Sequence, residues 1–263
     1  MIQIVKNRCW ILYFCLFITL AIMSSLKYHN LNTTFFDLGL FLNNFSMIAS
    51  GQWQSLFLSH VQPFGLFWAI PFYFLSTDWA ATIILICQAA FLVLPVIGLY
   101  RHFGIIPALA FSFYFPLWYN ALFDFHIDHL AIPILFGFFF FERKGKLPHA
   151  IFLAVLLALV KEPFALQTAF CGLYLSVARK NNLSGPLLTL FGVVYFTLAT
   201  QYIQHYFNSP FISITGGWDP VSNATFGWLG NSKQEIILFL ITNPSSVLLE
   251  IVTNQEKVKY VLY

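Results

Sequence analysis

The sequence predicts an all-α, polytopic transmembrane helical bundle. Hydrophobic residues make up 59% of the 263-residue chain and charged residues only 9%, against roughly 25% charged residues in soluble domains. The apolar runs are separated by short polar stretches, and the alternation typical of outer-membrane barrel strands is absent. We therefore expect a multi-pass membrane protein in which residues 1–263 form a single transmembrane domain.

Seven apolar segments are expected to be the spanning helices, because polar residues or helix-breaking prolines bound each of them. They are Cys9–Ser25, Trp79–Tyr100, Phe103–Tyr119, Asp124–Phe141, Leu147–Val160, Pro163–Ala178 and Pro186–His205. Several are shorter than the about 20 residues that a bilayer-spanning helix needs. Either some polar connections dip below the membrane surface, or the boundaries lie a few residues away.

The connections are expected to form a long first outer segment over residues 27–78 and an outer loop over residues 206–256. Within the first, Pro63–Leu75 is interpreted as interfacial or re-entrant rather than spanning, since it would reach only about 20 Å as a helix against an apolar core of about 30 Å. The N-terminal apolar run is interpreted as an uncleaved helix rather than a signal peptide. Because the sequence stops where another apolar helix would begin, we expect a C-terminus truncated before a further span.

Charge asymmetry places the N-terminus inside. With that orientation, eight of the thirteen Lys and Arg residues fall at inner connections, as the positive-inside rule requires. These eight are Lys6, Arg8, Arg101, Arg143, Lys144, Lys146, Arg179 and Lys180. All carboxylates except Glu142 fall outside, so the outer face is expected to hold nearly every candidate catalytic group.

Two of these groups lie in the first outer segment. Asp37 is either a catalytic carboxylate or the N-cap of a helix beginning at Leu38, because Asp satisfies free backbone N–H groups. His60 precedes Pro63, where an imidazole could bind phosphate, transfer a proton or lie at the headgroup level. The sequence leaves these alternatives open.

Four ionisable side chains gather between two apolar runs: Asp124, His126, Asp128 and His129. Because a charge at membrane depth costs roughly 2.5 to 3.5 kcal/mol, we expect them to line a wet cavity or an interface. On a helix, the two aspartates would share one face and the two histidines another, as adjacent polar rows. Such a set is either a polar helix cap or a site for a divalent metal such as Mg or Mn that holds pyrophosphate.

A third polar site, Lys161-Glu162, stands at a helix break that Pro163 explains. Adjacent residues point about 100° apart on a helix, so Lys161 and Glu162 are expected to serve different partners. Lys161 is interpreted either as a phosphate contact or as a snorkelling interfacial lysine.

In order along the chain, four motifs resemble a bacterial membrane-protein family known as domain of unknown function 2079 (DUF2079). They are Phe36-Asp37-Leu38-Gly39-Leu40-Phe41, Ser59-His60, Phe123-Asp124-Phe125-His126 with Leu130-Ala131-Ile132-Pro133, and Val160-Lys161-Glu162. The resemblance covers Phe35 to the C-terminus. It departs from the family pattern at Ile127-Asp128, where Pro-Glu is usual, and at Pro163, where an acid is usual.

That family in turn is similar to the polytopic glycosyltransferases of the C superfamily (GT-C), which take sugars from polyprenyl-phosphate donors at the outer face of the cytoplasmic membrane. Their hallmark acid lies in the first outer loop, where Asp37 stands here, and many carry another in the second, where Asp124 stands. The resemblance implies an inverting glycosyltransferase of the bacterial inner membrane. Its partners would be membrane lipid and a polyprenyl-phosphate-linked sugar, with no nucleic acid.

In this interpretation Asp37 is the general base that takes a proton from an acceptor hydroxyl as it attacks the anomeric carbon. Asp124 and His126 complete the catalytic set by orienting the acceptor or a metal-bound donor. Cationic groups would steady the departing lipid phosphate. The expected substrate-binding residues are His60, Lys161, Glu162, Asp128 and His129.

The rival function is a transporter or flippase, in which the outer Asp, His and Glu groups form a proton or ion pathway. Their gathering on one face argues against it, because a transport path needs polar groups near the midplane and access from both sides. A non-catalytic membrane protein is the third alternative, in which Asp37→Asn would leave function intact.

Overall fold

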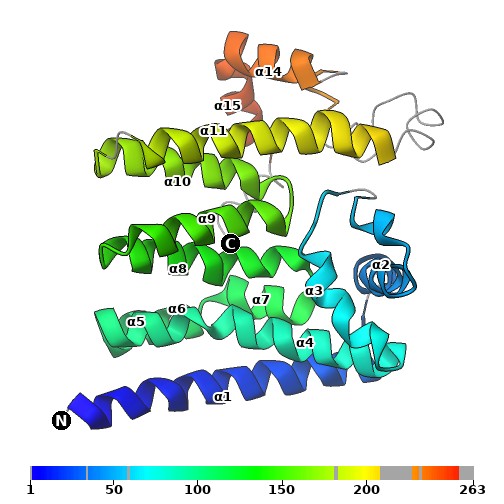
Figure 1. The fold of residues 1–263 in the computed structure, drawn as a ribbon, viewed down its shortest axis with the longest axis vertical. Coiled ribbons are helices and arrows are strands. Elements are labelled where there is room, and N and C mark those ends of the chain that lie inside the picture. The colour runs from blue at the N-terminus through cyan, green and yellow to red at the C-terminus, as the bar shows by residue number, and fades with distance from the viewer. Residues whose placement is uncertain are drawn as a thin grey trace. The chain divides into compact units, whose positions relative to one another are not determined.

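The computed structural model describes residues 2–33, 35–57, 60–180, 183–207, 227–230 and 233–254. Every regular element in these residues is helical, which confirms the all-α prediction (Figure 1). Internal contacts divide the chain into two compact units, Met1–Phe207 and Asn208–Tyr263. The predicted site residues all fall in the first unit.

Helical segments run back and forth between two ends of the first unit (Figure 1). Helix overlaps each of the seven predicted spans, although the one predicted over Asp124–Phe141 has its α-helix only from Ala131. α4 and α5, α6 and α7, and α11 and η5 are consecutive pieces of one segment. The elements are α1 (Ile2–His29), α4 (Thr77–Val93), α5 (Pro95–Phe103), α6 (Ile105–Ser112), α7 (Phe115–Phe123), α8 (Ala131–Arg143), α9 (Leu147–Val160), α10 (Phe164–Ala178), α11 (Ser184–Thr197) and η5 (Leu198–Ile203).

Length decides which helices can cross a bilayer. Among the described residues, Cys9–His29, Thr77–Phe103 and Ser184–Phe207 are long and apolar enough. Two bent pairs raise the number to as many as five: α6 with α7, bent by 44°, and a pair in the second unit bent by 89°. The structure therefore supports three to five crossing helices, and the seven-span arrangement stays a prediction.

The two ends of the first unit differ in charge. At one end, Arg101 lies over the ring of Trp10, Arg143 lies over the ring of Phe103, and Arg179 pairs with Glu142. The other end holds nearly all the carboxylates of the unit, and we call it the acidic end: Asp37, Asp78, Asp124, Asp128 and Glu162. The asymmetry expected from the sequence thus separates the ends of the folded unit.

The first outer segment folds into short helices at the acidic end. They are η1 (Phe35–Gly39), α2 (Leu40–Ala49), η2 (Trp53–Leu56), α3 (Gly65–Ala69) and η3 (Ile70–Tyr73). Aromatic packing joins them to the bundle: the ring of Phe125 lies 4.9 Å from that of Trp68 and 5.6 Å from that of Phe45. With pieces of only five and four residues, the Pro63–Leu75 stretch forms no helix that could span the membrane.

The second unit contains α14 (Lys233–Thr242) and α15 (Pro244–Thr253). Both fall within residues 206–256, so the expected outer loop is largely helical in its second half. Asn243 and Pro244 explain the 89° bend between them, because a proline cannot continue the hydrogen bonds of a preceding helix. The expected further span after Lys257 lies outside the described residues.

Helices α10 and α11 approach each other closely at glycines. An ideal Cβ on Gly192 would lie 2.5 Å from the carbonyl oxygen of Ala165, and one on Gly172 would lie 2.4 Å from the backbone nitrogen of Thr189. Small residues allow such backbone contact between membrane helices, where van der Waals packing supplies much of the association energy.

Replacing Gly192 with alanine is therefore expected to destabilise the protein by about 1 to 3 kcal/mol, because the added methyl meets backbone that cannot give way. Gly98→Ala in α5 is the matched control, since nothing lies within 4 Å of its Cβ position. Thermal unfolding in detergent measures both variants. Equal melting temperatures for the two would contradict the close α10–α11 contact.

Candidate functional site

The cluster at residues 124–129 is not part of an α-helix. α7 ends at Phe123, His126 is extended, and Ile127–Leu130 forms a 3-10 turn, η4, before α8 begins at Ala131. Pro133 explains the late start: in the first turn of α8 its missing N–H costs nothing, whereas in a helix running back through Asp124 it would remove a hydrogen bond. The predicted boundary at Asp124 is therefore wrong by seven residues.

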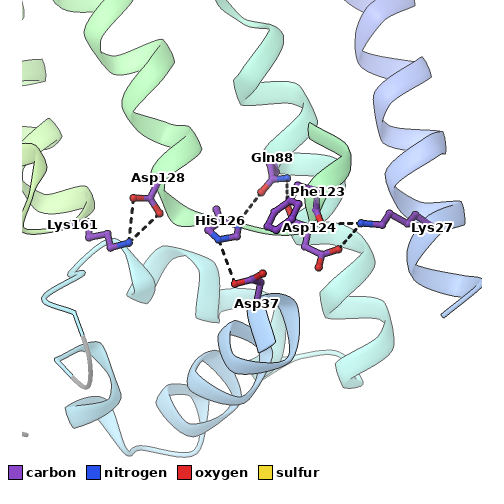
Figure 2. Close-up of polar contacts among 8 residues, drawn as sticks. All are labelled: Lys27, Asp37, Gln88, Phe123, Asp124, His126, Asp128 and Lys161. Carbon is purple, nitrogen blue, oxygen red and sulfur yellow. Dashed lines mark hydrogen bonds and ion pairs between the residues drawn. The ribbon is translucent and has the colours of Figure 1, made fainter. Parts of the chain in front are cut away.

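Because the helix is absent, the predicted polar rows do not form. Asp124 and Asp128 are held by different lysines, Lys27 and Lys161 respectively (Figure 2). The histidine rings of 126 and 129 do lie near each other, with centroids 5.9 Å apart. Only the histidine half of the predicted arrangement is present.

Lys27, near the end of α1, fastens the end of α7. Its Nζ donates to the carbonyl oxygens of Leu122 and Phe123, each at 2.8 Å, and lies 3.0 Å from Asp124 Oδ1. A cation at this position satisfies free carbonyls and the negative end of the helix dipole. The Asp124 side chain is fully buried while that of Lys27 keeps 27% exposure, so Lys27 supplies a positive charge beside a buried carboxylate.

Gln88 of α4 holds the extended chain that follows. Its Nε2 donates to the carbonyl oxygen of Asp124, and its Oε1 accepts from the backbone N–H of His126, both at 2.9 Å. The amide thus replaces the backbone partners that a strand would supply, at a position where Gln88 itself is buried. Figure 2 shows the result: His126 projects toward the first outer segment.

His126 meets Asp37 there. Its Nε2 lies 3.7 Å from Asp37 Oδ1, and the two side chains keep 26% and 35% exposure. Asp37 lies inside the π-helical turn η1, and α2 begins at Leu40 with Gly39 as its N-cap. The structure does not support capping of a helix that begins at Leu38, and it brings two predicted catalytic residues together.

Lys161 and Glu162 serve different partners, as their spacing predicted. Lys161 Nζ lies 3.3 Å from both carboxylate oxygens of Asp128. Glu162 accepts from the backbone N–H of Val61 at 3.0 Å and from Gln204 at 3.2 Å, and its Oε1 lies 2.7 Å from His60 Nδ1. Glu162, just before α10, thereby ties the first outer segment to Gln204 at the end of η5.

A pocket of about 360 Å³ opens beside His126. It draws its walls from α7, the 3-10 turn and the start of α8: Tyr119, Asn120, Phe123, His126, Asp128, His129 and Ile132. Three of these are predicted site residues, and three others, on α7, were not predicted. We call this cavity the α7–α8 pocket.

His129 is the most deeply buried of the titratable residues that line this pocket. Burial, helped by the nearby His126, lowers its pKa from 6.5 to about 4, while Asp128 opposes the shift. The imidazole is therefore neutral at neutral pH. Its Nδ1 is buried without a hydrogen-bond partner among the residues that the structure describes.

A metal centre does not fit the described residues. Across them, no three His, Cys, Asp or Glu side chains gather closely enough to hold an ion. The reason is the lysine pairing, which holds Asp124 and Asp128 apart. The expected Mg or Mn site gains no support from this arrangement.

Comparison with known proteins gives a family. A family model described as "Predicted membrane protein (DUF2079)" matches residues 27–263. The chain belongs to the DUF2079 family. No curated protein and no solved structure matches it. The matched region of this DUF2079 protein begins at Lys27 and contains every predicted site residue, so a membrane location is supported along with the family.

Sequence reasoning missed two residues that build the site, Lys27 and Gln88. Each had a signal: Lys27 ends the first apolar run, and Gln88 is a lone amide inside an otherwise apolar segment. A polar side chain at such a position needs a partner within the bundle. The sequence could not show that Lys27 and Gln88 both bind the stretch of chain that follows α7, around Phe123 and Asp124.

Lys27→Met is expected to destabilise this DUF2079 protein by about 3 kcal/mol, because it leaves the buried Asp124 carboxylate without its cation. Adding Asp124→Asn should restore part of the loss, since the second change removes the buried negative charge. Thermal unfolding of the purified variants in detergent measures both effects. Lys146→Met, at an exposed lysine, is the control; a loss no larger than the control's would refute the role of the pair.

His129 should make the protein sensitive to acid. Its folded pKa of about 4 lies below the ordinary 6.5, so between these values the unfolded chain binds more protons and stability falls as the pH falls. The free energy of unfolding therefore falls by up to about 3 kcal/mol on account of His129 as the pH is lowered from 6.5 to about 4, and it is unaffected by this group above pH 6.5. His129→Phe should flatten the melting temperature across this window. Parallel pH profiles for the parent and the variant would contradict the expectation.

Proposed function

We propose that this DUF2079 protein is a membrane glycosyltransferase. It moves a sugar from a polyprenyl-phosphate donor to an acceptor at the outer face of the cytoplasmic membrane. The observation that carries the proposal is the pairing of Asp37 with His126, 3.7 Å apart, beside a pocket at the acidic end of the bundle. The placement of Asp37 in the first outer segment, as in GT-C enzymes, supports the same function.

The reaction is a single displacement. An acceptor hydroxyl attacks the anomeric carbon, the bond from that carbon to the lipid phosphate breaks, and the hydroxyl proton passes to Asp37. The electron pair of the broken bond leaves with the phosphate, and the configuration at the anomeric carbon inverts. Asp37 suits the role of base because its carboxylate is only part exposed and has an imidazole beside it.

The contacts divide the remaining roles. His126 lies next to Asp37 and lines the pocket, so it orients the acceptor hydroxyl. Asp124 is buried against Lys27 and acts as a positioning residue, through the chain turn that carries His126. Lys161 would leave Asp128 to meet the lipid phosphate, while Glu162 with His60 holds the first outer segment in place.

The proposed topology has seven spans with the N-terminus inside. Its support is the charge difference between the ends, since the basic end carries Arg101, Arg143 and Arg179. The acidic end then faces outward, where polyprenyl-phosphate sugars are used by GT-C enzymes. The buried acids and His129 likewise lie at helix ends rather than at mid-helix in the described residues, which favours a transferase over a transporter.

Asp37→Asn is expected to lower sugar transfer by about 100-fold or more, because an amide cannot accept the proton. The measurement is radiolabelled sugar transfer from a panel of polyprenyl-phosphate sugars in proteoliposomes made with the full chain. Asp78→Asn is the matched control: it is an exposed acid at the same end, bonded to Tyr28 at 3.0 Å, and should keep activity.

Two results would overturn the proposal. Transfer that survives in Asp37→Asn removes the carboxylate from the reaction. Movement of labelled solute across the membrane without any transfer of label, lost in Asp37→Asn and kept in Asp78→Asn, identifies a transporter instead.

A further inference from the structure

The α7–α8 pocket has an aromatic wall. The rings of Tyr119 and Phe123 stack with centroids 5.6 Å apart and an interplanar angle of 24°. His126 continues the wall, 5.6 Å from Phe123, and His129 follows at 5.9 Å from His126. Successive rings are tilted by 24°, 37° and 58°, so they give the pocket a curved, weakly polar aromatic side against which the C–H face of a sugar can pack.

Polar groups stand around this wall. Asp128 offers carboxylate oxygens and Asn120 an amide, and both belong to the pocket lining. His129 adds a buried nitrogen, Nδ1, that has no partner in the described part of the chain. Few, convergent polar groups beside an aromatic surface are what orient a small ligand in a pocket, and 360 Å³ lies near the lower end of such sites.

The charge of the lining excludes a phosphate. Asp128 is the acid among the pocket residues, and no Lys or Arg is found among the described residues that line it. Lys161 reaches Asp128 at 3.3 Å without forming part of the lining, so it balances the carboxylate from outside. A phosphate placed inside would meet a carboxylate and no cation, whereas an uncharged polyol would meet acceptors for its hydroxyl groups.

We infer that the α7–α8 pocket is the subsite for an uncharged sugar ring, stacked on Tyr119 and Phe123 and hydrogen-bonded by Asp128 and His126, with the lipid phosphate outside it. The inference rests on the proposed function and gives that function its acceptor subsite. His126 joins the two parts of the site, because it lines the pocket and contacts Asp37. A hydroxyl bound beside His126 is thereby brought toward the base.

Saturation-transfer NMR on the purified full chain in detergent tests the subsite without requiring turnover. The probes are the methyl glycosides of glucose, galactose, mannose, N-acetylglucosamine and arabinose, all uncharged, and inorganic pyrophosphate serves as the anionic comparison. At least one glycoside should receive saturation. Phe123→Leu, which removes the ring but keeps an apolar side chain, should weaken binding of that glycoside about tenfold.

Phe113→Leu is the matched control, since Phe113 is 75% exposed and does not line the pocket. It should bind as the parent does. Asp128→Asn is the second variant. It should weaken glycoside binding, and it should strengthen pyrophosphate binding, because the carboxylate that repels an anion is gone. Melting temperatures confirm that each variant is folded before binding is compared.

Three results would overturn the inference. The first is a folded parent that transfers saturation to none of the glycosides, and the second is that pyrophosphate displaces a glycoside bound to the parent. The third is that Phe123→Leu binds the glycoside as tightly as the parent. Asp37→Asn separates this test from that of the proposed function, because it should bind the glycoside while losing transfer. Glycoside binding in a protein that transfers no sugar would keep the subsite and reject the transferase.

Discussion

The ion pair between Lys27 and Asp124 is the contact on which the acidic end depends. It joins α1 to the end of α7, where Lys27 also donates hydrogen bonds to the carbonyl oxygens of Leu122 and Phe123. With the helix ended there, the chain is free to extend through His126, and Gln88 fixes that extended piece from α4. Three segments far apart in the sequence thus position one imidazole.

The first outer segment supplies the other half of the site and is held by packing as well as by charge. Phe125, which is buried between the bundle and the first outer segment, contacts the rings of Phe41, Phe45 and Trp68. Glu162 holds the other end of the segment through Val61 and His60. Asp37 therefore belongs to a segment that is attached to the bundle at two places, which is how a part-exposed carboxylate can keep a fixed position.

Composition and hydropathy were enough to predict the helical class and the approximate place of each long helix, because a bilayer imposes both. Motif order was enough to predict the family. The local backbone of residues 124–130 could not be predicted in the same way. The i, i+4 spacing of Asp124 and Asp128 suggested one helix face, yet Lys27 and Lys161, 97 and 33 residues away in sequence, bind them separately. The pocket wall was missed for a related reason, since Tyr119 and Phe123 look like ordinary interfacial aromatics until the turn folds beside them.

The short helices α8, α9 and α10 have a consequence for the lipid around them. With 13, 14 and 15 residues they extend only about 20 to 23 Å, several ångströms less than a hydrocarbon core of about 30 Å. In the proposed topology the bilayer thins around this half of the bundle, or flanking polar side chains reach out to the interface. The headgroups of a thinned bilayer would then lie closer to Lys161 than those of an unperturbed one.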